Sequence, residues 1–252
     1  MYIIHQLLLR WLLFVTAVAI GLIVTWHQGL FHILFKNDSS NLSIVIVIVF
    51  AVSTMHAGWL ILRLSKYINQ VNTASRLMDR DQESQISVKN DEVVVGYSAV
   101  LPEGPMTYHI QNLARRLNNA SEPHQFAHDQ SQLLEALSKR IRSPQEFGWL
   151  IADLMIKLGL LGTVIGFILM LQSVPTVSDL DIATIQTMLS KMSDGMRVAL
   201  FTTLCGLIGG ILAGIQYHMA DRGADELIAG ITEVSEVHVT PRLVVGDYQR
   251  QN

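Results

Sequence analysis

Four long uncharged runs dominate the pattern of hydrophobic and polar positions along this chain of 252 residues. The runs are Trp11–Phe35, Leu42–Leu62, Leu158–Ser178 and Val198–Ala220. A helix of about 20 apolar residues crosses the hydrocarbon core of a bilayer, which is about 30 Å thick. Only 15% of the residues are charged, against about 25% in a typical soluble domain. The pattern therefore predicts an all-α integral membrane protein with four transmembrane helices.

The basic residues between the runs predict the topology. Eleven lysines and arginines lie between Arg63 and Lys157, whereas the two connections on the opposite side hold Lys36 and Lys191. Basic connections between spans stay in the cytoplasm. We therefore expect both termini and the long middle segment in the cytoplasm.

The four spans are expected to form two hairpins of different composition. Leu42–Phe50 in the first hairpin consists mostly of large aliphatic residues without a small-residue face, which suits contact with lipid. The second hairpin carries glycines that lie near one face of each span. These helix-packing glycines are Gly159, Gly162 and Gly166 in the third span, and Gly206, Gly209, Gly210 and Gly214 in the fourth. Small residues let helices approach closely in lipid, so the first hairpin is predicted to be peripheral and the second central.

The predicted organisation has four parts. Residues 1–65 form the peripheral hairpin, with spans at about 11–35 and 42–62, and residues 66–146 form a cytoplasmic helical segment. Residues 147–220 form the central hairpin, with spans at about 149–173 and 196–220. Residues 221–252 continue the fourth span as a helix to about Val237 and end in a frayed tail after Pro241.

The cytoplasmic segment is predicted to contain two helices that are separated near Pro123. Apolar residues recur at helical spacing at Met106, Ile110, Leu113 and Leu117, and again at Phe126, Leu133, Leu134, Leu137 and Ile141. Pro144 is expected to start or to kink the helix that continues into the third span. In the stretch 84–105, Val93–Val95 allows a short strand, but the prolines and glycine at 102–105 favour a loop.

The connection between the third and fourth spans also carries a pattern. Ser178–Asp181 resembles a helix start with an acidic first turn. An apolar stripe follows at Leu180, Ile185, Met188, Leu189 and Met192. We expect a short amphipathic helix at the outer membrane surface, and the alternative is an ordered connector without a role.

Two strings of glycine and threonine in the second hairpin resemble a known family. Leu158–Gly166 reads Leu-Gly-Leu-Leu-Gly-Thr-Val-Ile-Gly, and Gly195–Gly206 reads Gly-Met-Arg-Val-Ala-Leu-Phe-Thr-Thr-Leu-Cys-Gly. They resemble the Gly-Thr-Val-x-Gly and Ala-Leu-x-x-Thr-x-x-Gly strings of the MotA/TolQ/ExbB proton-channel family, in the same order. The resemblance covers about Trp149–Arg222. Two spans ahead of the cytoplasmic segment are similar to the four-span MotA branch, because TolQ and ExbB have one span there.

The resemblance implies an assembly and a function. Such subunits form a pentamer around a dimer of a MotB/ExbD/TolR-like partner, whose single transmembrane helix bears an aspartate. Residues 147–220 would then be the pore-lining hairpin. Ion flow across the bacterial inner (cytoplasmic) membrane would drive movement of the partner, as in a motor stator. The resemblance implies H⁺ as the transported ion, with Na⁺ as the alternative.

The residues themselves agree with an acid supplied by a partner. Carboxylates are the usual ion carriers inside a membrane, but none of the four uncharged runs contains Asp or Glu. Thr163, Thr203 and Thr202 can offer hydroxyl groups to an ion, to water or to a carboxylate, so we predict that they line the ion pathway. The alternative is that each hydroxyl bonds a carbonyl of its own helix. This alternative weighs most for Thr202, which lies about 100° around the helix from Thr203.

Residues at the ends of the second hairpin refine this interpretation. ExbB- and TolQ-type members carry a glutamate just inside the last span, where this chain has Val198, which favours a MotA-like path. Arg197 either anchors the helix at the interface by extending toward water or places a charge at the outer mouth of the pathway. Asp153 and Lys157 are spaced to pair at the cytoplasmic end of the third span.

Other function classes fit the sequence less well than an ion-driven membrane subunit. A non-conducting membrane scaffold of the same architecture is the alternative that Val198 motivates, and an inverted-repeat transporter conflicts with the unlike hairpins. The sequence lacks a Walker loop, a nucleophile elbow and a zincin motif, so we expect no enzyme and no cofactor. His124 and His128 can share a helix face, but without a third ligand we expect no metal site. A net charge of -3 without a basic cluster argues against nucleic acid.

Overall fold

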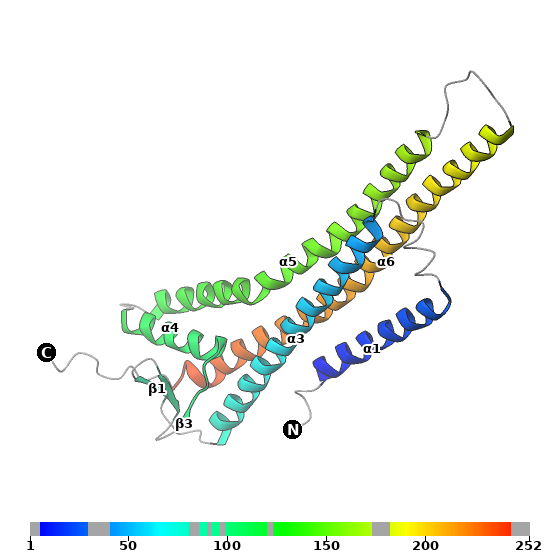
Figure 1. The fold of residues 1–252 in the computed structure, drawn as a ribbon. Helices are drawn as coiled ribbons and strands as arrows, with labels where there is room; N and C mark the ends of the chain where they lie inside the picture. Colours follow the sequence, from blue (N-terminus) through cyan, green and yellow to red (C-terminus); the bar gives the residue numbers. More distant parts are fainter. Residues whose placement is uncertain are drawn as a thin grey trace. The chain divides into compact units, whose positions relative to one another are not determined.

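The computed structural model describes residues 6–29, 41–80, 86–89, 92–95, 99–119, 123–172 and 182–242. In chain order its elements are α1 (Gln6–His27), α3 (Leu42–Arg80), β1 (Ile86–Lys89), β2 (Glu92–Val95), β3 (Ala99–Val100), α4 (Pro105–Asn119), α5 (Pro123–Leu171), α6 (Ile182–Val234) and the π-helical turn η1 (Ser235–Val239) (Figure 1). Four of the helices, α1, α3, α5 and α6, are long and apolar enough to cross a membrane. The prediction of a helical protein with four candidate spans is confirmed, but the all-α expectation is wrong for the three short strands.

Three helices extend far beyond the uncharged runs. α3, α5 and α6 contain 39, 49 and 53 residues, or about 58, 73 and 80 Å at 1.5 Å per residue. α1 instead ends at His27, because Gly29 adopts a left-handed φ of 73° and its amide donates to the carbonyl of Trp26. The predicted first span to about Phe35 is therefore too long as a single helix, and Leu30–Phe35 lie outside the described residues.

By its contacts the chain divides into two compact units. The first, here called the span unit, comprises Leu9–Trp59 and Gln145–Met219. The second, here called the sheet unit, comprises Met1–Leu8, Leu60–Pro144 and Ala220–Asn252. The four uncharged runs of the sequence fall mainly in the span unit, and the β-strands and α4 belong to the sheet unit.

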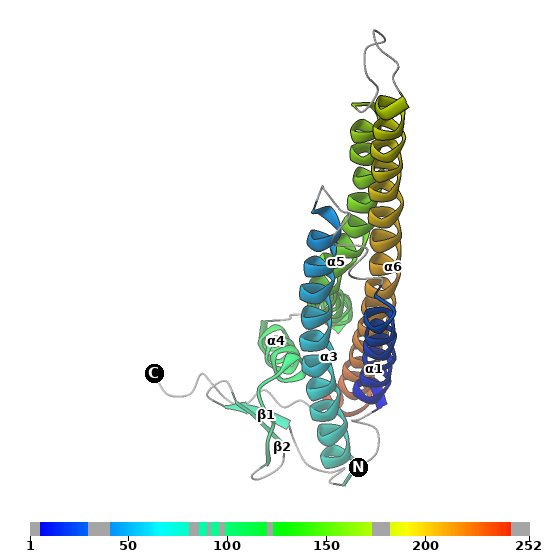
Figure 2. The same ribbon diagram turned by 45° about the vertical axis from the view of Figure 1, so that its right-hand side comes forward.

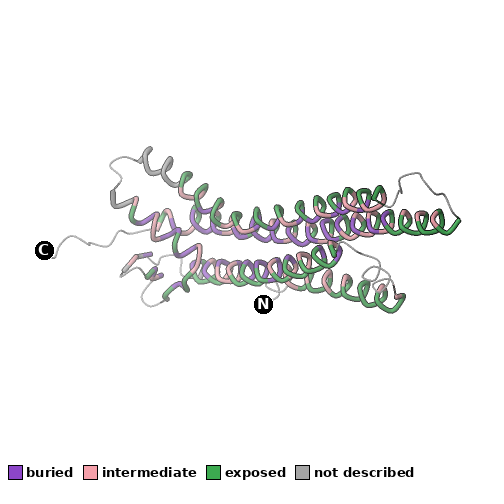
Figure 3. The backbone as a smooth tube through the Cα atoms, turned by 45° about the horizontal axis from the view of Figure 1, so that its top comes forward, coloured by how far each residue is buried: buried purple, intermediate pink, exposed green. Residues whose placement is uncertain are grey.

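In the span unit, α3 buries one face although α1 buries none of its residues. Buried positions of α3 in this unit include Ser43, Ile46, Ser53 and Ala57, and buried stretches recur along the long helices (Figure 3). Ile46 lies against Gly209 of α6, with its Cγ2 3.8 Å from a Cβ built on that glycine. The expectation that Leu42–Phe50 faces lipid is wrong for Ile46, because a glycine on α6 leaves room for it, and it stays a prediction for exposed positions such as Ile48.

The sheet unit contains a three-stranded antiparallel sheet in the order β1-β2-β3. Ile86 pairs with Val95, and Val94 pairs with Val100. Ile86, Val93 and Val95 are buried, as expected when β-branched side chains pack on one face of a sheet. The loop favoured for residues 84–105 is therefore wrong for these strands. The prolines that suggested it lie after β3, where they lead into α4 with Pro105 as its first residue, a position that suits proline.

The two predicted cytoplasmic helices are present as α4 and the first part of α5. Met106, Ile110 and Leu113 are buried along α4, which packs against β2 (Figure 2). The break near Pro123 is confirmed, since α5 begins there. Pro144 lies inside α5 and does not start it. The side chains of residues 117–130, which include Leu117 and Phe126, lie outside the described set.

The predicted amphipathic helix before the fourth span is not a separate element. Residues from Ile182 onward belong to α6, which runs unbroken to Val234. No proline interrupts this stretch, and Gly195 is accommodated because it packs on Gly166 of α5. The proposed helix start at 178–181 lies outside the described residues. The predicted continuation of the fourth span to about Val237 is confirmed by α6 and η1.

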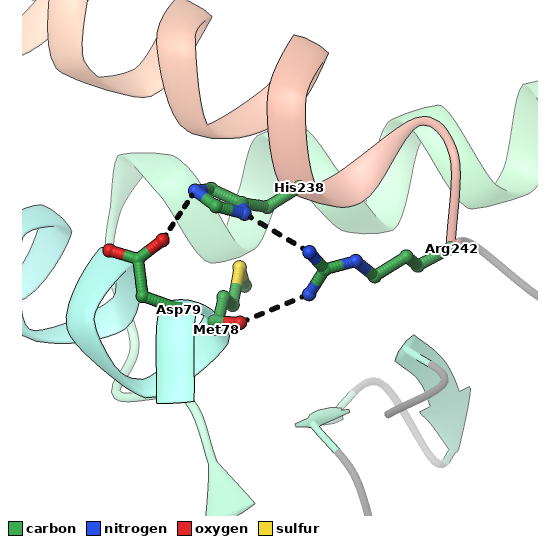
Figure 4. Close-up of polar contacts among 4 residues, drawn as sticks. All are labelled: Met78, Asp79, His238 and Arg242. Carbon is green, nitrogen blue, oxygen red and sulfur yellow. Dashed lines mark hydrogen bonds and ion pairs between the residues drawn. The ribbon is translucent and has the colours of Figure 1, made fainter. Parts of the chain in front are cut away.

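The chain that follows η1 is fastened to the end of α3 (Figure 4). Arg242 donates from Nη1 to the carbonyl oxygen of Met78 at 3.0 Å, and its Nη2 lies 3.4 Å from Nδ1 of His238. Nε2 of His238 lies 3.3 Å from Oδ1 of Asp79. Because arginine can only donate, Nδ1 of His238 accepts and Nε2–H faces the carboxylate. The predicted frayed tail therefore does not begin at Pro241, and residues 243–252 are outside the described set.

Candidate ion pathway

Glycine contacts bring α5 and α6 together as an antiparallel pair in the span unit. A Cβ built on Gly159 would lie 3.1 Å from Cα of Gly206, and one built on Gly206 would lie 2.6 Å from the carbonyl oxygen of Met155. Toward the other end, a Cβ on Gly166 would lie 2.6 Å from the carbonyl oxygen of Gly195. Any side chain at these glycines would meet backbone atoms, so the glycines allow the backbones to touch.

The glycines of the fourth span do not all face the same neighbour. A Cβ on Gly210 would meet Cγ1 of Ile156 at 2.5 Å, so this glycine faces α5 as Gly206 does. Gly209 lies between α5 and α3, with Sδ of Met155 at 3.4 Å and Cγ2 of Ile46 at 3.8 Å from its built Cβ, and Gly214 has Trp149 as its nearest neighbour at 3.6 Å. Helical geometry explains the division, because residues four apart share a face and adjacent residues do not.

The three predicted pathway threonines occupy different environments. Thr202 is fully buried, and its side chain fills the space above Gly162 of α5. Its hydroxyl donates to the carbonyl of Val198 at 2.8 Å, within its own helix. The hydroxyl of Thr203 lies 2.9 Å from the carbonyl of Ala199 and 3.2 Å from the carbonyl of Gly159 on α5. Thr203 is therefore the one of these three residues that bonds across the helix pair.

Thr163 lines an open hollow of about 410 Å³ on the α5–α6 pair. The other lining residues are Val164, Gly166, Phe167, Met170, Met196 and Ala199. The hydroxyl of Thr163 donates to the carbonyl of Leu160, one turn earlier. Thr163 thus places a single hydroxyl in an otherwise apolar hollow, and the lone pairs of its oxygen can still accept a hydrogen bond.

Charged side chains occur near both ends of the second hairpin. Arg197 lies 3.8 Å from Oδ1 of Asp194, one turn earlier on α6. Its neighbour Val198 is buried. Nζ of Lys157 lies 2.6 Å from Oδ2 of Asp153, so the pairing expected from their spacing is confirmed. Both residues of that pair are exposed, and such a pair contributes little to stability.

A polar cluster in the span unit was missed by the sequence reasoning. Nε1 of Trp11 donates to Oε1 of Gln216 at 3.2 Å, and Nε2 of Gln216 donates to Oγ1 of Thr54 at 3.1 Å. One residue further along α6, the hydroxyl of Tyr217 lies 3.1 Å from Nδ1 of His56. These residues are not carboxylates, the group on which the predicted ion pathway was based. A better signal was available, because polar residues inside an apolar span usually face a partner or a functional site.

Metal ligands do not gather in the part of the chain that the structure describes. No group of three or more His, Cys, Asp or Glu residues there could hold a metal ion. His124 and His128 both belong to α5, but their side chains are outside the described set.

The contact between Gly162 and Thr202 leads to a prediction about stability. Gly162→Ala is expected to destabilise the span unit by about 1–3 kcal/mol, because the new methyl group collides with Thr202 in a packed interface. The double variant Gly162→Ala/Thr202→Ala should recover much of this loss, since the second change removes the colliding atoms. Unfolding of the two single variants and the double variant in detergent completes a double-mutant cycle. Additive effects would contradict the contact.

A family comparison covers the same region of the chain. The model of the MotA/TolQ/ExbB proton channel family matches residues 102–233, which is more than half of the chain. The match contains both glycine and threonine strings, and it extends back through α4 beyond the start expected at about Trp149. Curated proteins and solved structures gave no match. Since the matched segment includes the α5–α6 pair and two of the four candidate spans, the chain belongs to the MotA/TolQ/ExbB proton channel family and is a multi-pass membrane protein.

Proposed function

We propose that the chain is the ring-forming subunit of an energy-transducing complex driven by an ion gradient. Five copies would surround a dimer of a single-span MotB/ExbD/TolR-like partner in the bacterial inner membrane. The proton motive force would drive ions through the assembly and so move the partner. Both termini and the sheet unit would lie in the cytoplasm, as the distribution of basic residues predicts. Family membership and four candidate spans support this proposal.

The observation that carries the proposal is a pair of hydroxyl groups on α5 and α6, within uncharged runs that supply no acid. Thr163 lies in the apolar hollow, and Thr203 bonds across the helix pair. The uncharged runs lack Asp and Glu, so an aspartate on the partner would complete the relay. One charge that crosses the membrane gains about 2.3 kcal/mol per 100 mV, so a few ions suffice for a large movement.

The three threonines lie in different environments, and we therefore assign them different roles. Thr163 and Thr203 would bind the ion, water or the partner's carboxylate, because each retains acceptor capacity. Thr202 is buried against Gly162 and bonds its own helix, which supports a packing role. Arg197 would hold a positive charge at the outer mouth, partly balanced by Asp194.

Valine substitutions test the ion-pathway roles. Valine matches threonine in shape and lacks the hydroxyl, so Thr203→Val and Thr163→Val should each lower ion flux by about tenfold or more. A hydrogen bond to a charged group contributes about 1.5–3 kcal/mol, and 1.4 kcal/mol corresponds to a factor of ten in rate. The measurement is proton flux into vesicles that contain the chain and a candidate single-span partner of the proposed type.

Thr202→Val is the matched control for that experiment, because it removes a hydroxyl from the same turn of α6. We expect the control to retain flux. Full flux in both Thr163→Val and Thr203→Val would rule out the proposed pathway. Repeating the measurement with and without Na⁺ at constant pH distinguishes proton transport from the sodium-driven alternative.

A second candidate function is a non-conducting membrane scaffold of the same architecture. Val198 supports it, because a buried valine stands where related ExbB- and TolQ-type sequences carry an acid. A scaffold should keep its cellular function in the Thr163→Val/Thr203→Val double variant, whereas a motor subunit should lose it. The same double variant therefore separates the two candidates.

A further inference from the structure

Within the span unit, His56 on α3 and Tyr217 on α6 form a hydrogen-bonded pair. Nδ1 of His56 lies 3.1 Å from the hydroxyl oxygen of Tyr217. That hydroxyl also lies 3.2 Å from the carbonyl oxygen of Ser53, and Oγ of Ser53 donates to it at 3.2 Å. Tyr217 and Ser53 are fully buried, while His56 is half-buried. The pair therefore joins a buried hydroxyl to a histidine that retains access to the surface of the unit.

The hydrogen count of this network favours one histidine tautomer. The tyrosine hydroxyl carries one hydrogen, and the carbonyl of Ser53 can only accept. When Tyr217 donates to that carbonyl, Nδ1 of His56 must carry the hydrogen that bonds the tyrosine oxygen. Nε2 of the neutral ring is then the nitrogen with a free lone pair, which can accept a proton.

Three aromatic rings lie close to the imidazole of His56. Its ring centroid lies 6.4 Å from that of Trp59, 5.9 Å from that of Phe147 and 6.0 Å from that of Tyr217. The imidazole of His56 therefore lies among rings from three helices, α3, α5 and α6.

Charged groups around this site are few. On α5, Glu146 precedes the contacting Phe147 and is exposed, and Gln145 is neutral and buried. On α6, His218 follows Tyr217 and is exposed, and Gln216 is neutral. In the part of the chain that the structure describes, His56 forms no ion pair. The hydrogen bond that the structure gives the His56 ring is therefore the one to the hydroxyl of Tyr217.

The position of the pair along the spans indicates where it would act. In the topology proposed above, His56 lies six residues before the cytoplasmic end of the second span at Leu62, or about 9 Å along the helix. Thr203 lies fourteen residues before Tyr217 on α6, or about 21 Å away. The threonines and the histidine therefore mark two different depths in the membrane.

We propose that His56, held by Tyr217, is a proton-binding site on the cytoplasmic half of the span unit. This inference rests on the proposed ion-driven function and adds an ionisable group that belongs to this chain. Nε2 takes a proton from a hydronium ion in the pathway, which leaves water and an imidazolium ring. The imidazolium returns the proton to water on the cytoplasmic side. No covalent bond between heavy atoms changes, and Nδ1–H remains bonded to Tyr217 throughout.

The first experiment observes the proton directly on the full chain in lipid nanodiscs. ¹⁵N-labelled histidine is followed by NMR from pH 8 to pH 5, the range in which histidine side chains change charge. We expect His56 to begin as the Nδ1–H tautomer and to become imidazolium. Tyr217→Phe keeps the ring on Gly148 but removes the hydroxyl, so it should shift the tautomer balance toward Nε2–H. A ring that never gains a proton, or one that Tyr217→Phe leaves unchanged, would overturn the proposal.

The second experiment separates this proposal from the ion pathway itself. His56→Gln should lower proton flux in vesicles with the partner by about tenfold or more, because a positioned proton carrier usually contributes at least that factor. His218→Gln replaces the exposed histidine that follows Tyr217 on α6, and this variant should retain flux. If Thr203→Val abolishes flux while His56→Gln leaves it intact, the pathway stands and the histidine site is wrong. Unchanged expression and melting of His56→Gln show that it folds, and Tyr217→Phe provides the second variant.

Discussion

Gly166→Ala is expected to force α5 and α6 apart and to destabilise the span unit by about 1–3 kcal/mol. The new Cβ would lie 2.6 Å from the carbonyl oxygen of Gly195, 2.7 Å from the amide nitrogen of Ala199 and 2.8 Å from its Cβ. None of these atoms can rotate away, because two belong to the backbone and the third is fixed to it. Helices in lipid associate through close packing, so a shift of the backbone should also disturb the hollow beside Thr163.

Gly21→Ala is the matched control for this substitution. Gly21 lies inside α1, and a Cβ built on it meets nothing within 4 Å. Both changes place alanine inside a helix, where it is favoured over glycine by about 0.5–1 kcal/mol. The difference between the variants therefore isolates the contact between α5 and α6.

Thermal unfolding in detergent, followed by tryptophan fluorescence, measures this difference. We expect a lower melting temperature for Gly166→Ala and an equal or higher one for Gly21→Ala. Proton flux in vesicles with the partner should fall in the first variant and persist in the second. Equal melting temperatures for the two variants would show that α5 and α6 do not pack through Gly166.

The features predicted well from the sequence are those with a local signal. Long uncharged runs indicate spans because the bilayer requires them, and four candidate spans are present. The pairing of Asp153 with Lys157 follows from helical spacing alone. Pro123 marks the start of a helix for an equally local reason, since proline suits the first turn.

The features predicted poorly depend on contacts between distant segments. β1 and β2 form because Ile86 and Val95 pair and are buried together, and the prolines beyond them misled a local analysis. α6 continues through Gly195 because that glycine meets Gly166 on another helix. Neither outcome can be inferred from one window of sequence.

The candidate site divides in the same way. The paired strings located the α5–α6 pair, but they could not separate Thr202 from Thr203, because burial depends on which residues of α5 face each threonine. His56 and Tyr217 lie 161 residues apart in the sequence. Each alone is an ordinary polar residue in an apolar run, and only the fold brings them within hydrogen-bonding distance.

The sheet unit is expected to lose stability in mild acid because of His109 on α4. Burial lowers the pKa of this side chain from its usual 6.5 to about 4. Its Nε2 is buried without a hydrogen-bond partner among the described residues. Between pH 6.5 and pH 4 the unfolded chain therefore binds a proton at this histidine that the folded chain does not bind. Stability rises with pH wherever the unfolded state binds more protons. The stability that the sheet unit owes to a neutral His109 is therefore fully present above about pH 6.5 and is lost as the pH falls toward 4.

The size of this loss follows from the two pKa values. One pKa unit corresponds to 1.36 kcal/mol, so the loss should be about 2 kcal/mol between pH 7 and pH 5. His109→Leu should remove this pH dependence, and it should cost little at pH 7 because an apolar side chain suits a buried site without a partner. The exposed His218 provides the control, since His218→Leu should leave the pH dependence of the sheet unit intact.

Hydrogen exchange of the full chain in nanodiscs can measure the effect in the sheet unit alone. The opening free energy of amides in α4 and β2, corrected for the intrinsic pH dependence of exchange, should fall by about 2 kcal/mol from pH 7 to pH 5. In His109→Leu the opening free energies at pH 7 and at pH 5 should agree. Equal protection of α4 at both pH values in the unmodified chain would contradict a neutral, buried His109. Because this readout does not depend on ion flux, it tests the packing of α4 on β2 separately from the proposed function.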